Sequence, residues 1–287
     1  MSDEIAKNTA PNASAVDLLK FIFQNSDIFI YVENSVLFHV FSNCGDIVMM
    51  IHVNNIDIWY KVSGQGYPIV LLHGNGQDHH FFRKLKRKLS ESYTVYAPDS
   101  RDHGKSGRVK YLDYMSNMND IAEFIKVLDI KSPILYGFSD GGIVGLLLAI
   151  HHPHLLRKLI ISGANTNPDG LRRVPFAFIK LAYLLTSSIK FQMMLTQPNI
   201  TDEELNSIVT PTLVLAGLRD VIRTEHTLEI AKNIPGCELK LLRGEGHESY
   251  ISKTDKIYSL IVSFIEKGGH CAPQDCGGKR YFEGMGY

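Results

Sequence analysis

The chain has 287 residues, of which 45% are hydrophobic and 21% are charged, a composition that predicts a packed globular protein and excludes a disordered one. The 30 basic residues balance the 30 acidic ones, so the net charge offers no general attraction to nucleic acid or to an acidic membrane. Four cysteines in this length exclude a dense disulfide scaffold. We therefore expect a globular protein with neither a nucleic-acid partner nor a membrane partner.

The N-terminus lacks the features of a secretory signal. It begins with acidic residues, and the apolar-rich stretch 21–41 is interrupted by polar side chains. No apolar run reaches the ~18 residues that a membrane-spanning helix needs. These observations predict a soluble, cytoplasmic protein. Residues 1–48 do not follow the pattern of the later chain, and we expect them to form an N-terminal extension of unknown role.

From Met50 onward, short apolar runs alternate with amphipathic segments. Residues 51–53 and 56–62 predict a β-hairpin across Asn54-Asn55. Further short apolar runs predict strands at 68–72, 93–97, 134–136, 158–161, 212–215 and 238–242. Because strands with near-continuous apolar runs are buried on both faces, this series predicts a parallel sheet covered by helices.

The segments between the strands have the apolar spacing of helices. Two sets fall at positions i, i+3, i+4 and i+7, which places each set on one helix face: Ile121, Phe124, Ile125 and Leu128; Ile257, Leu260, Ile261 and Phe264. Repeated alternation of strand and helix predicts an α/β fold with a mostly parallel central sheet and helices on both faces.

Residues 165–206 depart from this alternation. Phe176, Ile179 and Tyr183 with its neighbour Leu184 form an apolar helical stripe without an adjoining strand, and Thr201 with Glu204 fits a capping box. We expect a small helical cap inserted into an α/β domain spanning 49–268. The glycine-rich residues 269–287 are expected to form a loose tail.

The segment Gly137-Phe138-Ser139-Asp140-Gly141-Gly142 lies between a predicted strand and a predicted helix. This is the G-x-S-x-G pattern in the strand–turn–helix setting that a nucleophilic serine requires. The flanking glycines permit the tight turn that lifts the serine oxygen above the sheet. Ser139 is therefore the candidate nucleophile.

A serine hydroxyl needs a base, and the base must be a histidine oriented by a carboxylate. In this type of fold the order along the chain is serine, acid, histidine, and the partners follow later strands. Asp220 follows the strand predicted at 212–215, and His247 follows the strand at 238–242. Asp202 is a weaker candidate for the acid because it lies in the helical insertion.

The proposed chemistry also needs donors for an oxyanion. One donor is the backbone N–H of the residue after the nucleophile, Asp140, and the other comes from the loop His73-Gly74-Asn75-Gly76, where Asn75 is the candidate. Neither a G-x-x-x-x-G-K-[ST] nor a G-x-G-x-x-G phosphate-binding pattern occurs at this turn.

Together these motifs resemble the α/β-hydrolase superfamily over about 49–267. The markers are His73-Gly74, the serine segment, Asp220, His247 and Asp99-Ser100-Arg101-Asp102-His103-Gly104-Lys105-Ser106. The superfamily usually has glycine at the position of Asp102. Aspartate tolerates a left-handed backbone better than most residues, so we expect the turn to be kept.

The stretch from Gly137 to Asn165 is similar to the valacyclovir-hydrolase (biphenyl-hydrolase-like) branch of that superfamily. The resemblance implies that the side chain of Asp140 binds a substrate amino group, although an acid at a helix N-terminus is also stabilised by the helix dipole. Phe138 is a second candidate for substrate binding. Phe176, Phe178, Tyr183 and Met193 are candidates for an apolar acyl pocket or for the core of the insertion.

We therefore expect a serine hydrolase that cleaves a small carboxylic ester, or a related acyl substrate, with no cofactor and no metal. A perhydrolase, a lactonase or a carbon–carbon bond hydrolase would use the same residues. A small-molecule receptor with slow turnover is the alternative from another class. Cys271 and Cys276 with His270 could form part of a metal site, but they lack a fourth ligand, and reduced thiols are the simpler interpretation. The oligomeric state stays open.

Overall fold

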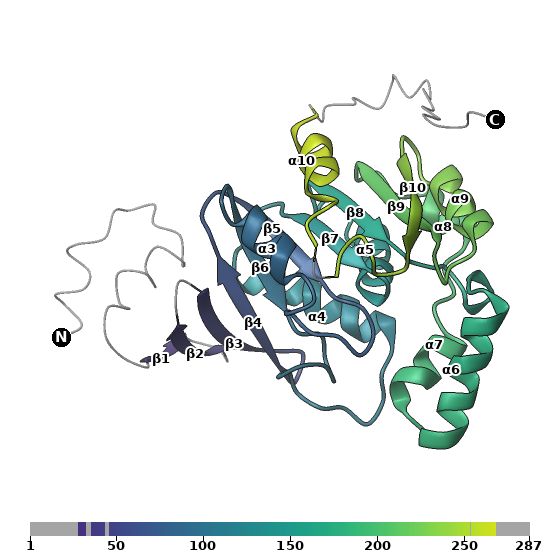
Figure 1. The fold of residues 1–287 in the computed structure, drawn as a ribbon. Coiled ribbons are helices and arrows are strands. Elements are labelled where there is room, and N and C mark those ends of the chain that lie inside the picture. Colours follow the sequence, from purple (N-terminus) through teal and green to yellow (C-terminus); the bar gives the residue numbers. More distant parts are fainter. Residues whose placement is uncertain (1–27, 33–35, 44–45, 253, 268–287) are drawn as a thin grey trace, which may run out of the picture.

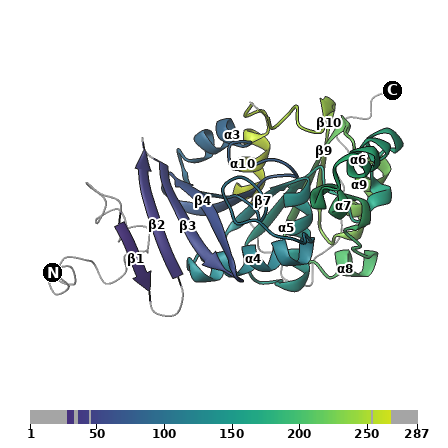
Figure 2. The ribbon, with the colours of Figure 1, turned by 90° about the horizontal axis from the view of Figure 1, so that it is seen from below.

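The protein is described by a computed structural model over residues 28–32, 36–43, 46–252 and 254–267. The described strands form a sheet in the order β1-β2-β3-β4-β6-β5-β7-β8-β9-β10. The bounds are β1 Ile28–Val32, β2 Val36–Asn43, β3 Asp46–Val53, β4 Ile56–Ser63, β5 Tyr67–Leu72, β6 Tyr93–Pro98, β7 Ile134–Phe138, β8 Lys158–Ser162, β9 Thr212–Arg219 and β10 Glu238–Gly246. In the order of the sheet, β1, β2, β3, β4 and β6 pair antiparallel with their neighbours. From β6 onward, the pairs β6–β5, β5–β7, β7–β8, β8–β9 and β9–β10 are all parallel. The predicted mostly parallel core is therefore confirmed, and Figure 2 shows the antiparallel strands β1 to β4 at one side of it.

The predicted hairpin is present, with Val53 paired to Ile56 across Asn54-Asn55. Both turn residues have positive φ, which asparagine adopts more readily than most side chains. The sheet continues beyond this hairpin into β2 and β1, so backbone pairing extends into the region expected to be an extension. The expected boundary at residue 48 falls inside β3, and the division of the chain into an extension, a domain and a tail stays a prediction. The expected tail, with Cys271 and Cys276, lies outside the described residues.

Helices cover both faces of the sheet (Figure 1). The bounds are α3 Arg83–Leu89, α4 Tyr114–Val127, α5 Asp140–His151, α6 Arg173–Thr186, α7 Ile189–Thr196, α8 Asp202–Asn206, α9 Thr224–Asn233 and α10 Tyr258–Glu266. One apolar core joins the sheet to α4, α5, α8 and α9, and the other joins it to α3 and α10. The two predicted helical stripes lie in these cores, since Ile121, Phe124 and Ile125 face the first and Ile257, Ile261 and Phe264 face the second.

The predicted insertion lies between β8 and β9. It contains a short 3₁₀ turn, Pro168–Gly170, followed by the pair α6 and α7 and then α8. The capping box is present: Thr201 Oγ1 accepts from the Glu204 N–H, and the Glu204 carboxylate accepts from the Thr201 N–H. Figure 1 shows α6 and α7 as a helical hairpin beside the sheet. Within the described residues, no helix is long and apolar enough to cross a membrane.

Candidate active site

The turn between β7 and α5 presents Ser139 at the carboxyl edge of the sheet. Its backbone has φ 52° and ψ −117°, a conformation that residues other than glycine rarely adopt. A Cβ at Gly137 would lie 2.2 Å from the Gly141 carbonyl oxygen, and one at Gly141 would lie 2.1 Å from the Leu72 oxygen. The two glycines are therefore required for the close approach of β7, α5 and β5 that positions Ser139.

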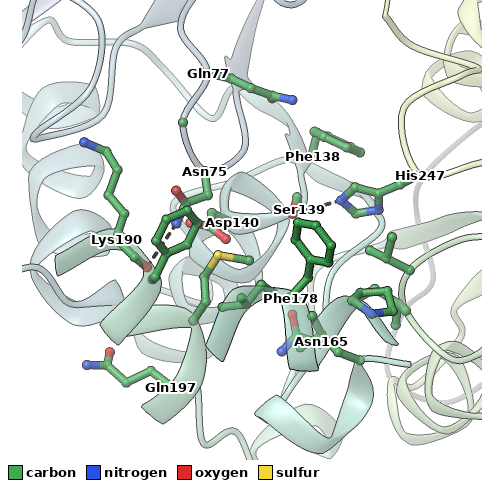
Figure 3. A pocket seen from close by; sticks show the side chains of 18 of the residues that line it. Asn75, Gln77, Phe138, Ser139, Asp140, Asn165, Phe178, Lys190, Gln197 and His247 are labelled. Atoms are coloured by element: carbon green, nitrogen blue, oxygen red, sulfur yellow. Dashed lines mark hydrogen bonds between the residues drawn. The ribbon is translucent and has the colours of Figure 1, made fainter. Parts of the chain in front are cut away.

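The imidazole of His247 bridges Ser139 and Asp220. The Ser139 hydroxyl lies 3.2 Å from His247 Nε2 (Figure 3). On the other side of the ring, His247 Nδ1 lies 2.7 Å from Asp220 Oδ1. With the proton on Nδ1, the ring donates to the carboxylate and accepts from the serine. This is the arrangement in which a histidine can remove a proton from an alcohol.

Strand ends hold the two partners of Ser139. Asp220 follows β9 and is 2% exposed, and its Oδ1 also accepts from the Ile222 N–H at 3.0 Å. His247 follows β10, and its ring packs on Phe138 with centroids 4.7 Å apart. A Cβ at Gly163 would lie 2.8 Å from the same ring, so the end of β8 leaves room for the imidazole only because it carries a glycine. These contacts fix the ring orientation that the hydrogen bonds need.

The loop after β5 lies against the nucleophile. A Cβ at Gly74 would be 3.0 Å from Ser139 Cβ. The Gly74 N–H donates to Gln77 Oε1 at 3.0 Å, and the Gln77 N–H donates to the Gly74 carbonyl at 3.2 Å, which closes the loop as a turn. Asn75 lines the same pocket as Ser139, where its backbone N–H can serve with that of Asp140, the first residue of α5. The N–H roles of Asn75 and Asp140 stay predictions.

The Asp140 carboxylate is buried at the floor of this pocket. Its Oδ1 accepts from the Tyr114 hydroxyl at 2.9 Å, and within the described part of the chain Oδ2 has no hydrogen-bond partner. Burial raises the pKa of Asp140 to about 6, although the Tyr114 hydroxyl, the Asn75 side chain and the charge of His247 favour its ionised form. Tyr114 was missed from the sequence because nothing in the spacing of α4 indicates that its first residue reaches α5.

The pocket has a volume of about 510 Å³ and is bounded on one side by the insertion. Of the sequence candidates, Phe138 and Phe178 line it, whereas Phe176, Tyr183 and Met193 do not. Met193 is instead buried in the core that joins the sheet to α4 and α5, rather than in a separate core of the insertion. The neighbouring Met194 lines the pocket in its place.

Polar contacts connect the insertion to the catalytic edge. Lys190, from α7, donates to the carbonyl oxygen of Asp102 at 2.6 Å and to its carboxylate at 2.5 Å. The Asn75 amide donates to the Lys190 carbonyl at 3.4 Å. Asp102 has φ 61°, so the expected left-handed turn is confirmed at the position where glycine is usual. The aspartate therefore gives the cap an anchor that glycine could not provide.

A second polar contact joins two residues that line the pocket. Gln77 Nε2 donates to Glu248 Oε1 at 2.9 Å, and Glu248 directly follows His247. The side chain of Gln77 thus ties the loop after β5 to the loop that carries His247. The sequence analysis missed Gln77. Its position two residues after Asn75 places it in the loop after β5, but this spacing does not reveal a contact with a residue 171 positions away.

Metal-ligating side chains gather at Asp78, His79 and His80, whose ligand atoms lie within 4.8 Å of one another. Two of these atoms already have partners. His79 Nδ1 lies 2.8 Å from the buried carboxylate of Asp99, and His80 Nδ1 lies 3.0 Å from Asp78. These histidines hold the loop before α3.

Comparisons with known proteins agree with the fold. A family model described as the alpha/beta hydrolase fold matches residues 67–185. The human serine hydrolase BPHL is 27% identical over 248 residues, covering 75% of this chain and 84% of that protein. It represents the branch whose resemblance was seen in the stretch from Gly137 to Asn165.

Solved structures show the same fold at low sequence identity. A meta-cleavage product hydrolase from Pseudomonas fluorescens aligns with a TM-score of 0.64 at 20% identity, covering 75% of this chain and 96% of that one. Est816, described as an N-acyl homoserine lactone degrading enzyme, aligns with a TM-score of 0.64 at 22% identity, covering 75% and 99%.

Proposed function

Since the chain belongs to the α/β-hydrolase superfamily and is a hydrolase, we propose that it cleaves a small carboxylic ester, or a related acyl substrate, through an acyl-enzyme intermediate. The observation that carries the proposal is the continuous hydrogen-bonded path from Ser139 through His247 to Asp220. A buried carboxylate, an oriented imidazole and an alcohol on a strained turn are the parts that acyl transfer needs. No comparison assigns these roles residue by residue.

In the first half of the reaction, the Ser139 oxygen attacks the substrate carbonyl as His247 Nε2 takes its proton. The Asn75 and Asp140 N–H groups stabilise the negative oxygen, a contribution of roughly 3–4 kcal/mol per donor in a dry site. His247 then gives the proton to the leaving alcohol as the carbon–oxygen bond breaks. Asp220 stabilises the charged imidazole between these two transfers.

In the second half, a water molecule attacks the acyl-enzyme. His247 accepts a proton from this water, and the same N–H groups stabilise the second tetrahedral anion. The proton then passes to Ser139 as the bond to the acyl carbon breaks, which releases a carboxylic acid. The steps use only side chains, backbone groups and water.

The pocket supports a substrate with a positively charged group beside the scissile carbonyl. The buried Oδ2 of Asp140 lies next to the nucleophile and suits an ammonium group, which would complete its hydrogen bonding. The similarity to the human serine hydrolase BPHL is the second support, because the resemblance to its branch implies that the side chain of Asp140 binds a substrate amino group. We therefore propose amino-acyl esters as the preferred class, with Phe138 in the wall that the substrate contacts.

The test uses p-nitrophenyl butyrate and a fluorophosphonate probe with the wild type and Ser139→Ala. The substitution is expected to abolish both the burst of nitrophenol and the covalent labelling. Ser188→Ala is the matched control, because Ser188 lines the same pocket but lies outside the β7–α5 turn. A full burst that survives in Ser139→Ala would overturn the assignment, whatever the control shows.

The related activities are separated by a screen of four substrate classes. These are amino-acyl esters, neutral esters, N-acyl homoserine lactones and substrates of carbon–carbon bond hydrolases. Fast turnover of lactones or carbon–carbon bonds with slow ester turnover would replace the esterase proposal. Slow turnover of every class together with tight retention of a small molecule would favour the receptor alternative. The cytoplasmic location stays a prediction.

A further inference from the structure

Helix α6 exposes a row of large apolar side chains. The row comprises Val174, Phe178, Leu181, Leu184 and Leu185, which are 52% to 77% exposed. No residue of α6 is buried. A contiguous group of large apolar side chains on one exposed helix face marks an interaction site, because water solvates such a face poorly.

The opposite side of α6 is apolar as well. Phe176, Ile179 and Tyr183 are half-buried there, and the helix packs against α7. A helix that is apolar all round is normally enclosed on every side. In α6 only one side is enclosed by the described residues, so the exposed side requires an occupant.

The charges on this segment indicate what the occupant is. Residues 171–201 contain Arg172, Arg173, Lys180 and Lys190 but no aspartate or glutamate. Two of the cations are engaged, since Arg172 donates to the Asp220 carbonyl and Lys190 to Asp102. The other two, Arg173 and Lys180, are exposed on α6 and have no acidic partner within the described residues.

An apolar helix face with basic neighbours is the composition of a helix that lies in the interface of an anionic membrane. A second copy of this chain fits less well. A two-fold symmetric contact through α6 would bring two basic segments together without an acid to pair with either. An anionic lipid surface satisfies both the apolar row and the two cations.

The row continues into the pocket. Phe178 belongs to the exposed row and also lines the pocket, together with its neighbours Pro175 and Ile179. Figure 3 shows Phe178 on the insertion side of the cavity that contains Ser139. A molecule that leaves a surface in contact with α6 therefore has an apolar path to the catalytic serine.

We propose that the exposed face of α6 docks the protein on an anionic lipid surface, so that ester substrates held in that surface reach Ser139 past Phe178. Docking itself does not depend on catalysis, and only the delivery of substrate rests on the proposed function. The inference differs from the expectation of no membrane partner, which stays a prediction. That expectation rested on net charge and on the absence of a spanning run, and neither reports a helix lying on a surface.

Docking is tested by flotation of the full chain, carrying Ser139→Ala, with phosphatidylcholine vesicles that contain or lack phosphatidylglycerol. The double variant Leu181→Gln/Leu185→Gln is expected to lower the vesicle partition coefficient by about tenfold or more, because two exposed leucines leave the interface. Lys180→Glu is expected to lower partition by about fivefold or more on the anionic vesicles alone. Val209→Gln is the control, since Val209 is 64% exposed and lies outside α6.

Equal partition of the wild type and the double variant would overturn the proposal. So would a dimer in sedimentation velocity that the double variant converts to a monomer, because a second copy would then cover α6. In the active chain, the double variant is expected to keep full activity on a water-soluble ester and to lose activity on the same acyl group carried by a vesicle lipid. Vesicle binding without any ester hydrolysis would remove the proposed function and leave docking intact.

Discussion

The carboxyl edge of the sheet and the helical insertion are stabilised in opposite ways. At the edge, Asp220 is buried, and His247 is fixed by two hydrogen bonds and by a ring contact. In the insertion, no residue of α6 is buried, and contacts such as Lys190 with Asp102 join α7 to the body. The residues proposed to perform the chemistry are thus set by the sheet, whereas the pocket wall that the insertion supplies, including Phe178, belongs to a helix with no buried residue.

The largest effect is expected from Asp220→Asn. This substitution tests whether the residues at the carboxyl edge of the sheet carry out the proposed acyl transfer. The amide removes the charge that stabilises the imidazolium and favours the wrong tautomer, so kcat should fall by about 10³- to 10⁴-fold. Steady-state hydrolysis of p-nitrophenyl butyrate measures the loss. Asp202→Asn is the control, because Asp202 is exposed at the start of α8, and its kcat should stay at the wild-type value.

The next effect tests substrate selection at the pocket floor. Asp140→Asn keeps an oxygen that can accept from the Tyr114 hydroxyl but removes the charge. For an amino-acyl ester, KM should rise by about 10- to 100-fold, the range for losing a charge-assisted hydrogen bond. For the neutral ester of the same size, KM should hardly change. An equal rise for both esters would mean that Asp140 does not bind the amine.

The same carboxylate predicts a pH dependence. Its pKa of about 6 in the folded protein means that the site is neutral at low pH and charged above about pH 6. The ratio of kcat/KM for the amino-acyl ester to that for its neutral counterpart should therefore rise through about pH 6 and fall again as the substrate ammonium group loses its proton, near the pKa of ~7.7 of an α-amino group. Groups that act equally on both esters cancel in this ratio. A ratio that is flat from pH 5 to 8 would contradict the assignment.

Asp140 also affects stability with a definite sign. Because its folded pKa exceeds the unfolded value of about 3.9, folding favours the neutral form. The stability gained in this way is present below about pH 4 and is lost as the pH rises through about 6. Urea unfolding of the wild type should show this decline, and the isosteric Asp140→Asn should show less of it.

The smallest effect concerns the attachment of the insertion. Burial opposes ionisation of Asp102, but Lys190, the Val109 N–H and Arg108 together outweigh it and lower the pKa of the carboxyl group. Lys190→Met and Asp102→Gly should each destabilise the fold, with a coupling of about 1 to 2 kcal/mol in a double-mutant cycle. Glycine suits the positive φ of this position, so the cycle isolates the ion pair. Additive effects in urea unfolding would show that the pair does not hold the cap.

Much of the catalytic edge could be predicted because its signals are local. The glycines around Ser139 mark a turn, and Asp220 and His247 each follow an apolar strand that periodicity identifies. The hairpin at Asn54-Asn55 and the capping box at Thr201 are equally local, and both are confirmed. Each depends on neighbours within a few residues, which is the range over which residue type determines backbone geometry.

Contacts between elements that are distant in the sequence could not be predicted in this way. The hydroxyl of Tyr114 reaches Asp140 over 26 positions, and Lys190 reaches Asp102 over 88. Neither pair leaves a periodic trace, because a single side-chain contact between loops and helices does not repeat. The apolar stripe of α6 was visible in the sequence, but which of its two sides is covered depends on tertiary packing.

The position of β10 at the outer end of the sheet, with His247 directly after it, has a consequence during protein synthesis. A ribosome makes Ser139 and its turn 108 residues before it makes His247. On the proposed mechanism the serine remains an unreactive alcohol until the last parallel strand joins β9. The nascent chain is thus protected from acylation by cellular esters until the rest of its active site has been made.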